Sequence, residues 1–192
     1  MKNLNLLVFL FLSMLSNTAF SQLSQGTFRI GPILSFNSST SEIDGLDDKF
    51  KTINLNLGLS GGYYVIDNFE IGVEAAVTST KSKLGADETK ENGLSIGPIV
   101  SYMVSLYDKL YLPIIAGVGF NSVKVNDDIS ETTYSGMVYG IGAGLEYLVG
   151  NKLGARLLLS TNFGSLGDTD SSDEINLKGS KIGLGVNFYF SR

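Results

Sequence analysis

The sequence predicts an all-β fold, namely an eight-stranded antiparallel up-and-down transmembrane β-barrel. Apolar residues alternate with small or polar ones in eight stretches, which is the pattern of strands with two unlike faces. Each stretch has about ten residues or more, the length of a tilted membrane strand, whereas globular strands average about five or six. The connections alternate between tight and long, as they do in outer-membrane barrels.

The chain opens with a predicted signal peptide. Lys2 precedes an apolar run at 4–15, and the small residues Ala19 and Ser21 suit a cleavage site before Gln22. The apolar run is too short to cross a bilayer comfortably, although a retained N-terminal membrane anchor is the alternative. We therefore expect a signal peptide at 1–21 and a barrel domain at 22–192.

The expected strands lie at 26–36, 52–65, 69–79, 93–105, 109–123, 134–148, 152–164 and 179–191. In the first half of the chain, alternation is regular from Ile53 to Leu59 and from Phe69 to Val77. The first and fourth strands share one motif, IGPILSF at 30–36 and IGPIVSY at 96–102. Two occurrences of a motif are not enough to indicate a repeat protein.

The second half of the chain alternates as clearly. Every second residue is apolar from Met137 to Tyr147, from Leu153 to Leu159 and from Ile182 to Phe190. An even number of strands places both termini on one side of the membrane, which we expect to be the periplasmic side.

Four of the predicted connections are long and polar, at 37–51, 80–92, 124–133 and 165–178. They hold fourteen of the 19 acidic residues, whereas the strand interiors hold few charges. Three proline residues, Pro32, Pro98 and Pro113, fall inside strands, where each removes a ladder hydrogen bond. We expect β-bulges at Gly31–Pro32 and Gly97–Pro98.

A soluble barrel such as a lipocalin-like carrier also alternates, with its apolar face inward, and is the alternative fold. Two features favour the membrane barrel. The less apolar face is rich in Gly, Ser and Asn, which suit a narrow lumen but would weaken a solvent-exposed strand. The aromatic residues fall into two groups by height, as in the two girdles of a lipid-facing barrel.

The group near the tight turns is Phe28, Tyr63, Tyr64, Phe69, Tyr102, Tyr107, Tyr111, Tyr147, Phe188, Tyr189 and Phe190. The group near the long connections is Phe36, Phe50, Phe120, Tyr134 and Phe163.

The run from Gly93 to Phe120 (GLSIGPIVSYMVSLYDKLYLPIIAGVGF) resembles the outer-membrane β-barrel domain family of small porin-like proteins, the OmpA/OmpX-type eight-stranded barrels. It has a Gly-Pro strand ending in aromatics, a tight turn, and a strand with Pro and the pair Gly117 and Gly119. The resemblance implies the fold and an outer-membrane location in a Gram-negative cell. The final strand of such proteins commonly ends in an aromatic residue, which here lies two residues early, at Phe190.

Composition excludes several function classes. With no Cys and no His, the chain lacks disulfides, the usual zinc sites and Ser-His or Cys-His catalysis. The net charge of −5 disfavours a nucleic-acid partner. The run Gly93–Gly97 (GLSIG) reads as a strand and not as a nucleophile elbow, and no Ser-x-x-Lys motif occurs. We therefore expect no enzyme activity, no catalytic residue and no cofactor.

The candidate site is a polar network on the inward face, made of Arg29, Glu70, Glu74, Glu146, Arg156 and Lys181. Charges in a narrow interior must pair or be hydrated, because burying a lone ion is very costly. Glu146 and Arg156 flank one tight turn on adjacent strands, so we expect them to pair. Such a network either fills the lumen with ion pairs, or lines a gated polar path or an active site.

A second, weaker candidate lies in the acidic run Asp168, Asp170, Asp173 and Glu174. Carboxylates suit divalent cations, but the run lacks the Gly and distant Glu of a calcium loop, so no specific metal site is expected. The alternatives are a solvated acidic rim, or divalent cations that bridge the rim to lipopolysaccharide phosphates.

These observations predict a non-enzymatic integral outer-membrane barrel with a packed polar interior. Its acidic loops would serve adhesion, partner binding or envelope integrity. The alternatives are a small conduit or a subunit of an envelope secretion or transport assembly, and less plausibly an outer-membrane enzyme. The expected partners are outer-membrane lipid and lipopolysaccharide, the barrel assembly machinery during biogenesis, and an unidentified envelope protein.

Overall fold

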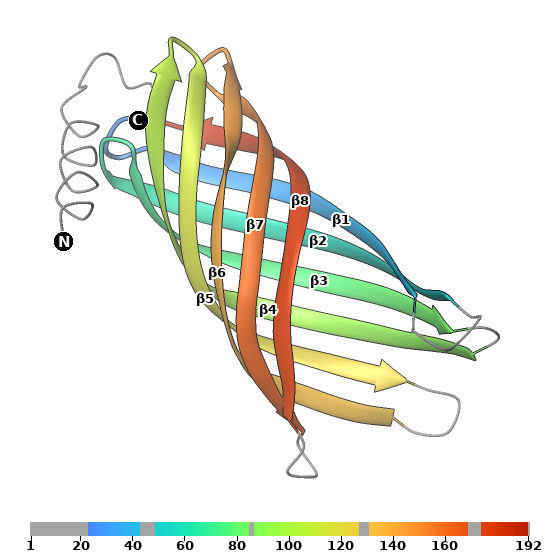
Figure 1. The fold of residues 1–192 in the computed structure, drawn as a ribbon. Coiled ribbons are helices and arrows are strands. Elements are labelled where there is room, and N and C mark those ends of the chain that lie inside the picture. The colour runs from blue at the N-terminus through green and yellow to red at the C-terminus, as the bar shows by residue number, and fades with distance from the viewer. Residues whose placement is uncertain (1–22, 43–48, 85–86, 127–130, 169–173, 192) are drawn as a thin grey trace, which may run out of the picture.

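A computed structural model describes residues 23–42, 49–84, 87–126, 131–168 and 174–191. The strands are β1 (Phe28–Glu42), β2 (Lys49–Ile66), β3 (Phe69–Leu84), β4 (Asp87–Tyr107), β5 (Leu110–Asn126), β6 (Glu131–Val149), β7 (Leu153–Asp168) and β8 (Glu174–Phe190). Each pairs antiparallel with its neighbour in sequence, and β8 pairs with β1, so the sheet is a closed barrel (Figure 1). The predicted fold class is confirmed. No helix in the described ranges is long and apolar enough to cross a membrane.

The strands are staggered by ten residues around the barrel. Starting at Ile71, the paired residues on β4, β5, β6 and β7 lead in one direction to Ser180 on β8. In the other direction, the paired residues on β2 and β1 lead to Phe190 on β8, ten residues further along the same strand. With the usual rise and strand spacing, this stagger tilts the strands by roughly 40° from the barrel axis. Eight strands at this tilt enclose a lumen just wide enough for side chains to fill.

The barrel has two unlike ends. At the short-turn end, the turns Asp67–Asn68, Asp108–Lys109 and 150–152 join the strands. At the splayed end, β1 and β8 separate: their register ends at Phe36 and Ile182, although both strands continue. Figure 1 shows β1 to β4 diverging from β7 and β8 at this end.

The strands reach further toward the splayed end than the sequence predicts. The gaps between strands there are only 43–48, 85–86, 127–130 and 169–173, so the predicted extents of the long loops are wrong. Hydrophobic alternation stops before the splayed ends of the strands, but backbone pairing continues there in polar segments, as Glu42 opposite Lys49 shows.

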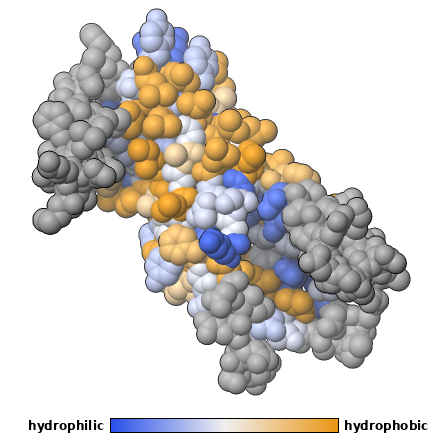
Figure 2. All heavy atoms as spheres, in the orientation of Figure 1, coloured by the Kyte–Doolittle hydropathy of each residue, from blue (hydrophilic) through white to orange (hydrophobic). Residues whose placement is uncertain are grey.

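The outward face is apolar and the inward face small or polar. Large hydrophobic side chains such as Leu184 and Ile141 are 64% and 59% exposed on the outside. Figure 2 shows hydrophobic atoms over much of this surface. On β8 the belt runs from Ile182 to Phe190, and that length of tilted strand spans roughly 20 Å, most of the roughly 25 Å of an outer-membrane hydrophobic band. An exposed apolar belt of this extent marks a surface that contacts a membrane or another protein and not water.

Inward glycines let adjacent strands pack closely. A Cβ built at Gly97 would lie 2.1 Å from the carbonyl oxygen of Val118, and one at Gly144 would lie 2.0 Å from that of Leu157. Any side chain at these positions would push two neighbouring strands apart.

The bulges predicted at the prolines are wrong. β1 keeps one register with β2 through Pro32, and its register with β8 is the same at Ile30 as at Ile33. Each proline N lacks a hydrogen toward only one neighbouring strand, so it leaves a gap in one ladder without shifting it. The register shifts lie instead at Tyr64–Ile66 and Ser105–Tyr107, beside tight turns.

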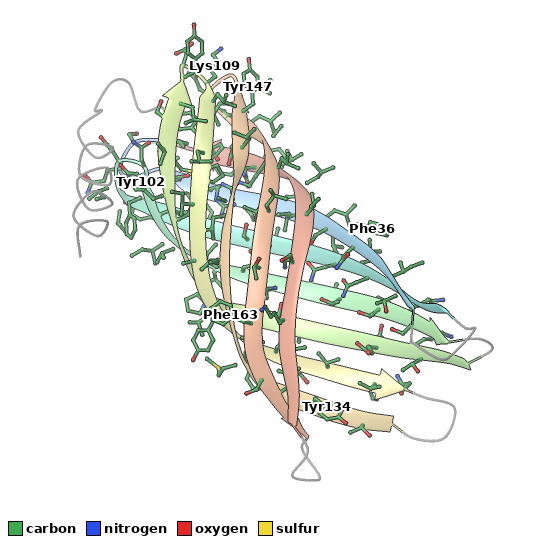
Figure 3. All side chains as sticks on the ribbon, viewed as in Figure 1. Phe36, Tyr102, Lys109, Tyr134, Tyr147 and Phe163 are labelled. Atoms are coloured by element: carbon green, nitrogen blue, oxygen red, sulfur yellow. The ribbon has the colours of Figure 1, made fainter. Side chains whose placement is uncertain are left out.

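The predicted girdles hold in part. Tyr102 and Tyr147 lie near the short-turn end and Phe36 and Phe163 toward the splayed end (Figure 3). The side chain of Phe50 lies outside the described residues. Three residues assigned to the short-turn girdle point into the barrel and are buried, namely Tyr64, Tyr111 and Tyr189. Neighbouring residues of a strand face opposite sides, so a girdle position cannot be assigned from height alone.

Candidate functional site in the barrel lumen

The structure separates the six predicted network residues into two groups. Arg29 from β1, Glu70 from β3, Glu146 from β6 and Arg156 from β7 are buried in the short-turn half of the lumen. Glu74 from β3 and Lys181 from β8 are partly exposed and line a cavity in the other half.

The first ion pair joins strands that are not adjacent. The Arg29 Nε atom donates to both carboxylate oxygens of Glu70, at 2.9 and 3.0 Å, and Nη2 lies 2.8 Å from Oε1. Gly62 of the intervening strand β2 lies beside this ion pair. A Cβ atom at position 62 would lie 1.9 Å from Glu70 Oε1. A glycine on the intervening strand therefore makes room for this contact.

The second ion pair joins adjacent strands. Glu146 and Arg156 lie directly opposite in the register of β6 and β7, and Arg156 Nε donates to Glu146 Oε2 at 2.6 Å. Gly154 faces the same carboxylate, since a Cβ there would lie 2.3 Å from Oε1.

Asn187 on β8 links the two pairs. Its Oδ1 accepts from Arg29 Nη1 at 2.8 Å, and its Nδ2 donates to Glu146 Oε1 at 2.9 Å. The same Glu146 oxygen accepts from the Tyr189 hydroxyl. Arg29 Nη1 also donates to Ser60 Oγ at 2.9 Å. A single network therefore crosses the lumen and takes side chains from β1, β2, β3, β6, β7 and β8.

A layer of buried, mostly apolar side chains lies next to this network, at the short-turn end. It consists of Leu23, Tyr64, Met103, Tyr111, Leu148 and Tyr189. Leu23 precedes β1, and its carbonyl accepts from the Asn68 backbone N–H at 3.0 Å, which holds this segment against the β2–β3 turn. The network and this layer form one plug that fills the short-turn half, which we call the lumen plug.

Sequence reasoning missed most of the plug. Asn187 and Ser60 carry no charge, so nothing in the pattern marked them beyond their inward position. Leu23 lies outside every predicted strand. Tyr64, Tyr111 and Tyr189 could have been identified only from the alternation of each strand, which places them on its inward face.

Beyond the plug, toward the splayed end, the lumen contains a cavity of about 170 Å³ lined from all eight strands. Its polar lining includes Asn56, Thr78, Ser95, Asn121, Asn162, Glu74 and Lys181. The cavity is large enough for several water molecules or one small solute, but smaller than the usual pocket for a drug-sized ligand.

The acidic candidate cannot be placed. Asp170 and Asp173 lie outside the described residues, and the side chains of Asp168 and Glu174 are not described. Among the described side chains, no group of three or more carboxylates gathers in a way that could hold a metal ion.

Known proteins that are similar to this chain have the same barrel fold. Residues 7–190 match the model of the family described as outer membrane protein beta-barrel domain. No curated protein sequence matches the chain.

Three solved structures illustrate the structural likeness. Neisserial surface protein A, from Neisseria, superposes with a TM-score of 0.62 at 15% identity, covering 86% of this chain and 98% of that one. OprG of Pseudomonas aeruginosa gives 0.58 at 14% identity, covering 90% and 100%. The N-terminal barrel domain of Pseudomonas aeruginosa OprF gives 0.56 at 18% identity, covering 86% and 98%. Identities this low carry information about the fold alone.

Proposed function

Because the chain belongs to the outer membrane protein beta-barrel domain family, we propose that it is a non-enzymatic barrel closed to solutes, which acts through its splayed end. A barrel of this family is integral to the outer membrane and surrounded by lipid. Its work would then be adhesion, partner binding or envelope integrity, performed by the strand ends and connections that project from the membrane.

The lumen plug is the observation that carries this proposal. The network joins β1 to β8 through hydrogen bonds of 2.6–3.0 Å, and the layer beneath it is fully apolar apart from tyrosine hydroxyls. A solute crossing the barrel would have to break paired charges in a narrow, low-dielectric space. An eight-stranded barrel has little other room for a path.

The orientation follows from the same proposal. The signal peptide at 1–21 would direct export, and the barrel assembly machinery would insert the domain at 22–192. The short-turn end and both termini would face the periplasm, and the splayed end would face the exterior. Lipopolysaccharide would then surround the splayed half.

Conductance tests the closed lumen. The purified barrel in a planar bilayer should give no stepwise current above that of the bilayer alone. The matched variant is Arg29→Ala with Arg156→Ala, which removes both cations from the plug and should admit transient current. Stable channels in the wild-type protein would contradict the proposal and favour the small conduit.

Exchange of the strand connections tests where the function lies. Cells carrying the barrel with the connections at 43–48, 85–86, 127–130 and 169–173 replaced by Gly-Ser turns should lose adhesion or envelope integrity. The control is the heat-modifiable gel migration of a folded barrel, which the exchange should leave intact. Unchanged phenotypes, with stable co-purification of other envelope proteins, would favour a subunit of a secretion or transport assembly.

A further inference from the structure

The cavity beyond the lumen plug contains two opposite charges that do not pair with each other. Glu74 lines it from β3 and Lys181 lines it from β8, and both side chains are only partly exposed. Within the described parts of the chain, neither side chain takes part in an ion pair or a hydrogen bond. The four charges of the lumen plug, by contrast, are all paired. The cavity therefore offers one carboxylate and one ammonium group to a ligand.

The stagger of the strands places Glu74 and Lys181 at nearly the same height. From Glu74 the register reaches β8 at Asn187 through β2 and β1, and at Leu177 through β4 to β7. The point on β8 that is level with Glu74 divides this interval in proportion to three strands against five, so it lies at about Gly183. Lys181 is two residues from Gly183, toward the splayed end. Because β3 and β8 are three strands apart around the ring, the two charges lie across the lumen from each other.

The cavity has an aliphatic floor and a polar wall. The same stagger places four aliphatic lining residues level with Glu74 or slightly nearer to the lumen plug, namely Ile33, Ile99, Ile115 and Leu158. Ser95, Asn121 and Asn162 line the cavity nearer to the splayed end. In the described ranges, the side chains of these three polar residues form no hydrogen bond within the protein. Two amides and a hydroxyl are therefore available to a ligand, together with the two charges.

This combination of groups favours a ligand that carries both signs of charge. A cation alone would pair with Glu74 but leave Lys181 without an anion, and an anion alone would do the reverse. An ion that enters a narrow lumen loses hydration, and opposite charges and hydrogen bonds offset that loss. The aliphatic floor can accept a short apolar group. The cavity volume of about 170 Å³ limits the ligand to a small solute.

We propose that the cavity binds a small zwitterion of the α-amino acid type, with its ammonium group at Glu74 and its carboxylate at Lys181. The ligand would enter from the splayed end. There, Ser35 and Gly183 both line the cavity and form the last rung but one of the β1–β8 ladder, beyond which the two strands separate. The lumen plug blocks the opposite end, so the ligand would bind without crossing the barrel. The site goes beyond the proposed function, because a closed lumen neither requires nor excludes it.

Binding of L-alanine to the purified barrel in detergent micelles tests the site. Saturation-transfer NMR follows the alanine methyl group through a titration, with empty micelles as the background. Propionate and ethylamine are the matched ligands, because each keeps the methyl group but lacks one of the two charged groups of alanine. Alanine should bind at least about tenfold more tightly than either of them, since each lost charged contact weakens binding by about that factor.

Two variants assign each charged group of the ligand to its partner. Glu74→Gln should abolish the preference for alanine over propionate, because the ligand ammonium loses its anion, and should keep the preference over ethylamine. Lys181→Gln should do the reverse. Lys178→Gln is the matched control, since Lys178 lies exposed on the outward face of the same strand, and it should bind alanine as the wild-type protein does. Unchanged heat-modifiable migration would show that all three variants fold.

Three outcomes would overturn the proposal. One is alanine binding no tighter than propionate or ethylamine, which would mean that the cavity does not recognise a zwitterion. Another is wild-type selectivity in both Glu74→Gln and Lys181→Gln, which would place the binding elsewhere. The third is no saturation transfer to alanine above that of empty micelles. None of these readouts involves channel current, so the proposed function is tested separately.

Discussion

The two halves of the barrel are built from the same eight strands but differ in how their inward-facing residues pack. In the short-turn half, inward charges are paired, buried and tied to an apolar layer that includes Leu23. In the splayed half, Glu74 and Lys181 face a cavity of about 170 Å³, and β1 no longer pairs with β8. We infer from this contrast that the packing which stabilises the barrel is concentrated at the short-turn end.

Among these predictions, the substitution of Glu146 should lower the free energy of unfolding most, because Glu146 makes several contacts within the lumen plug. Glu146→Gln removes the charge that Arg156 and Tyr189 contact, and it leaves the Arg156 cation buried without its anion. We expect a loss of about 3–5 kcal/mol in the free energy of unfolding. Urea unfolding in vesicles measures it, and a loss below about 1 kcal/mol would show that the plug does not stabilise the barrel.

A smaller effect should follow from crowding the same half. Gly62→Ala would bring a Cβ to 1.9 Å from Glu70 Oε1, so the Arg29–Glu70 pair must shift. We expect a loss of about 1–3 kcal/mol, as for other overpacked interiors. Gly179→Ala on β8 is the matched control, because a Cβ there meets no atom within 4 Å. Equal losses at the two sites would mean that the halves do not differ in packing.

The smallest effect is expected from the charges in the splayed half. Glu74→Gln and Lys181→Gln each change a partly exposed group outside the lumen plug, so each should alter the free energy of unfolding by less than about 1 kcal/mol. The same urea titration measures both variants. A loss as large as that of Glu146→Gln would extend the plug into the cavity and remove the contrast between the halves.

Much of the fold could be predicted because lipid imposes a strict period of two on each strand. The resemblance seen in Gly93–Phe120 is confirmed by the family match over 7–190. The outer strand ends could not be predicted, since pairing in water needs no hydrophobic alternation. Pairing of Glu146 with Arg156 needs only the neighbouring turn, whereas pairing of Arg29 with Glu70 spans an intervening strand and depends on tilt and stagger.

The role of Asn187 was beyond sequence reasoning for a similar reason. It contacts Arg29, which lies 158 residues earlier, and Glu146 on a strand two positions away around the barrel. An uncharged residue that faces the lumen becomes recognisable only when closure brings these strands together. Leu23 was missed because a residue before the first strand has no alternation to mark its direction.

The ladder between β1 and β8 also governs the order of folding. It pairs Phe28 in the first strand with Phe190 in the eighth, so the ring cannot close until β8 has been synthesised. Contacts so distant in sequence form slowly, and two unpaired strand edges meanwhile invite association with other chains. The chain would therefore need protection in transit. The hydrogen bond between Arg29 and Asn187 joins β1 to β8, so it forms only when the ring closes. Because it must break before the ring reopens, we expect the closed barrel to unfold slowly even where its equilibrium stability is modest.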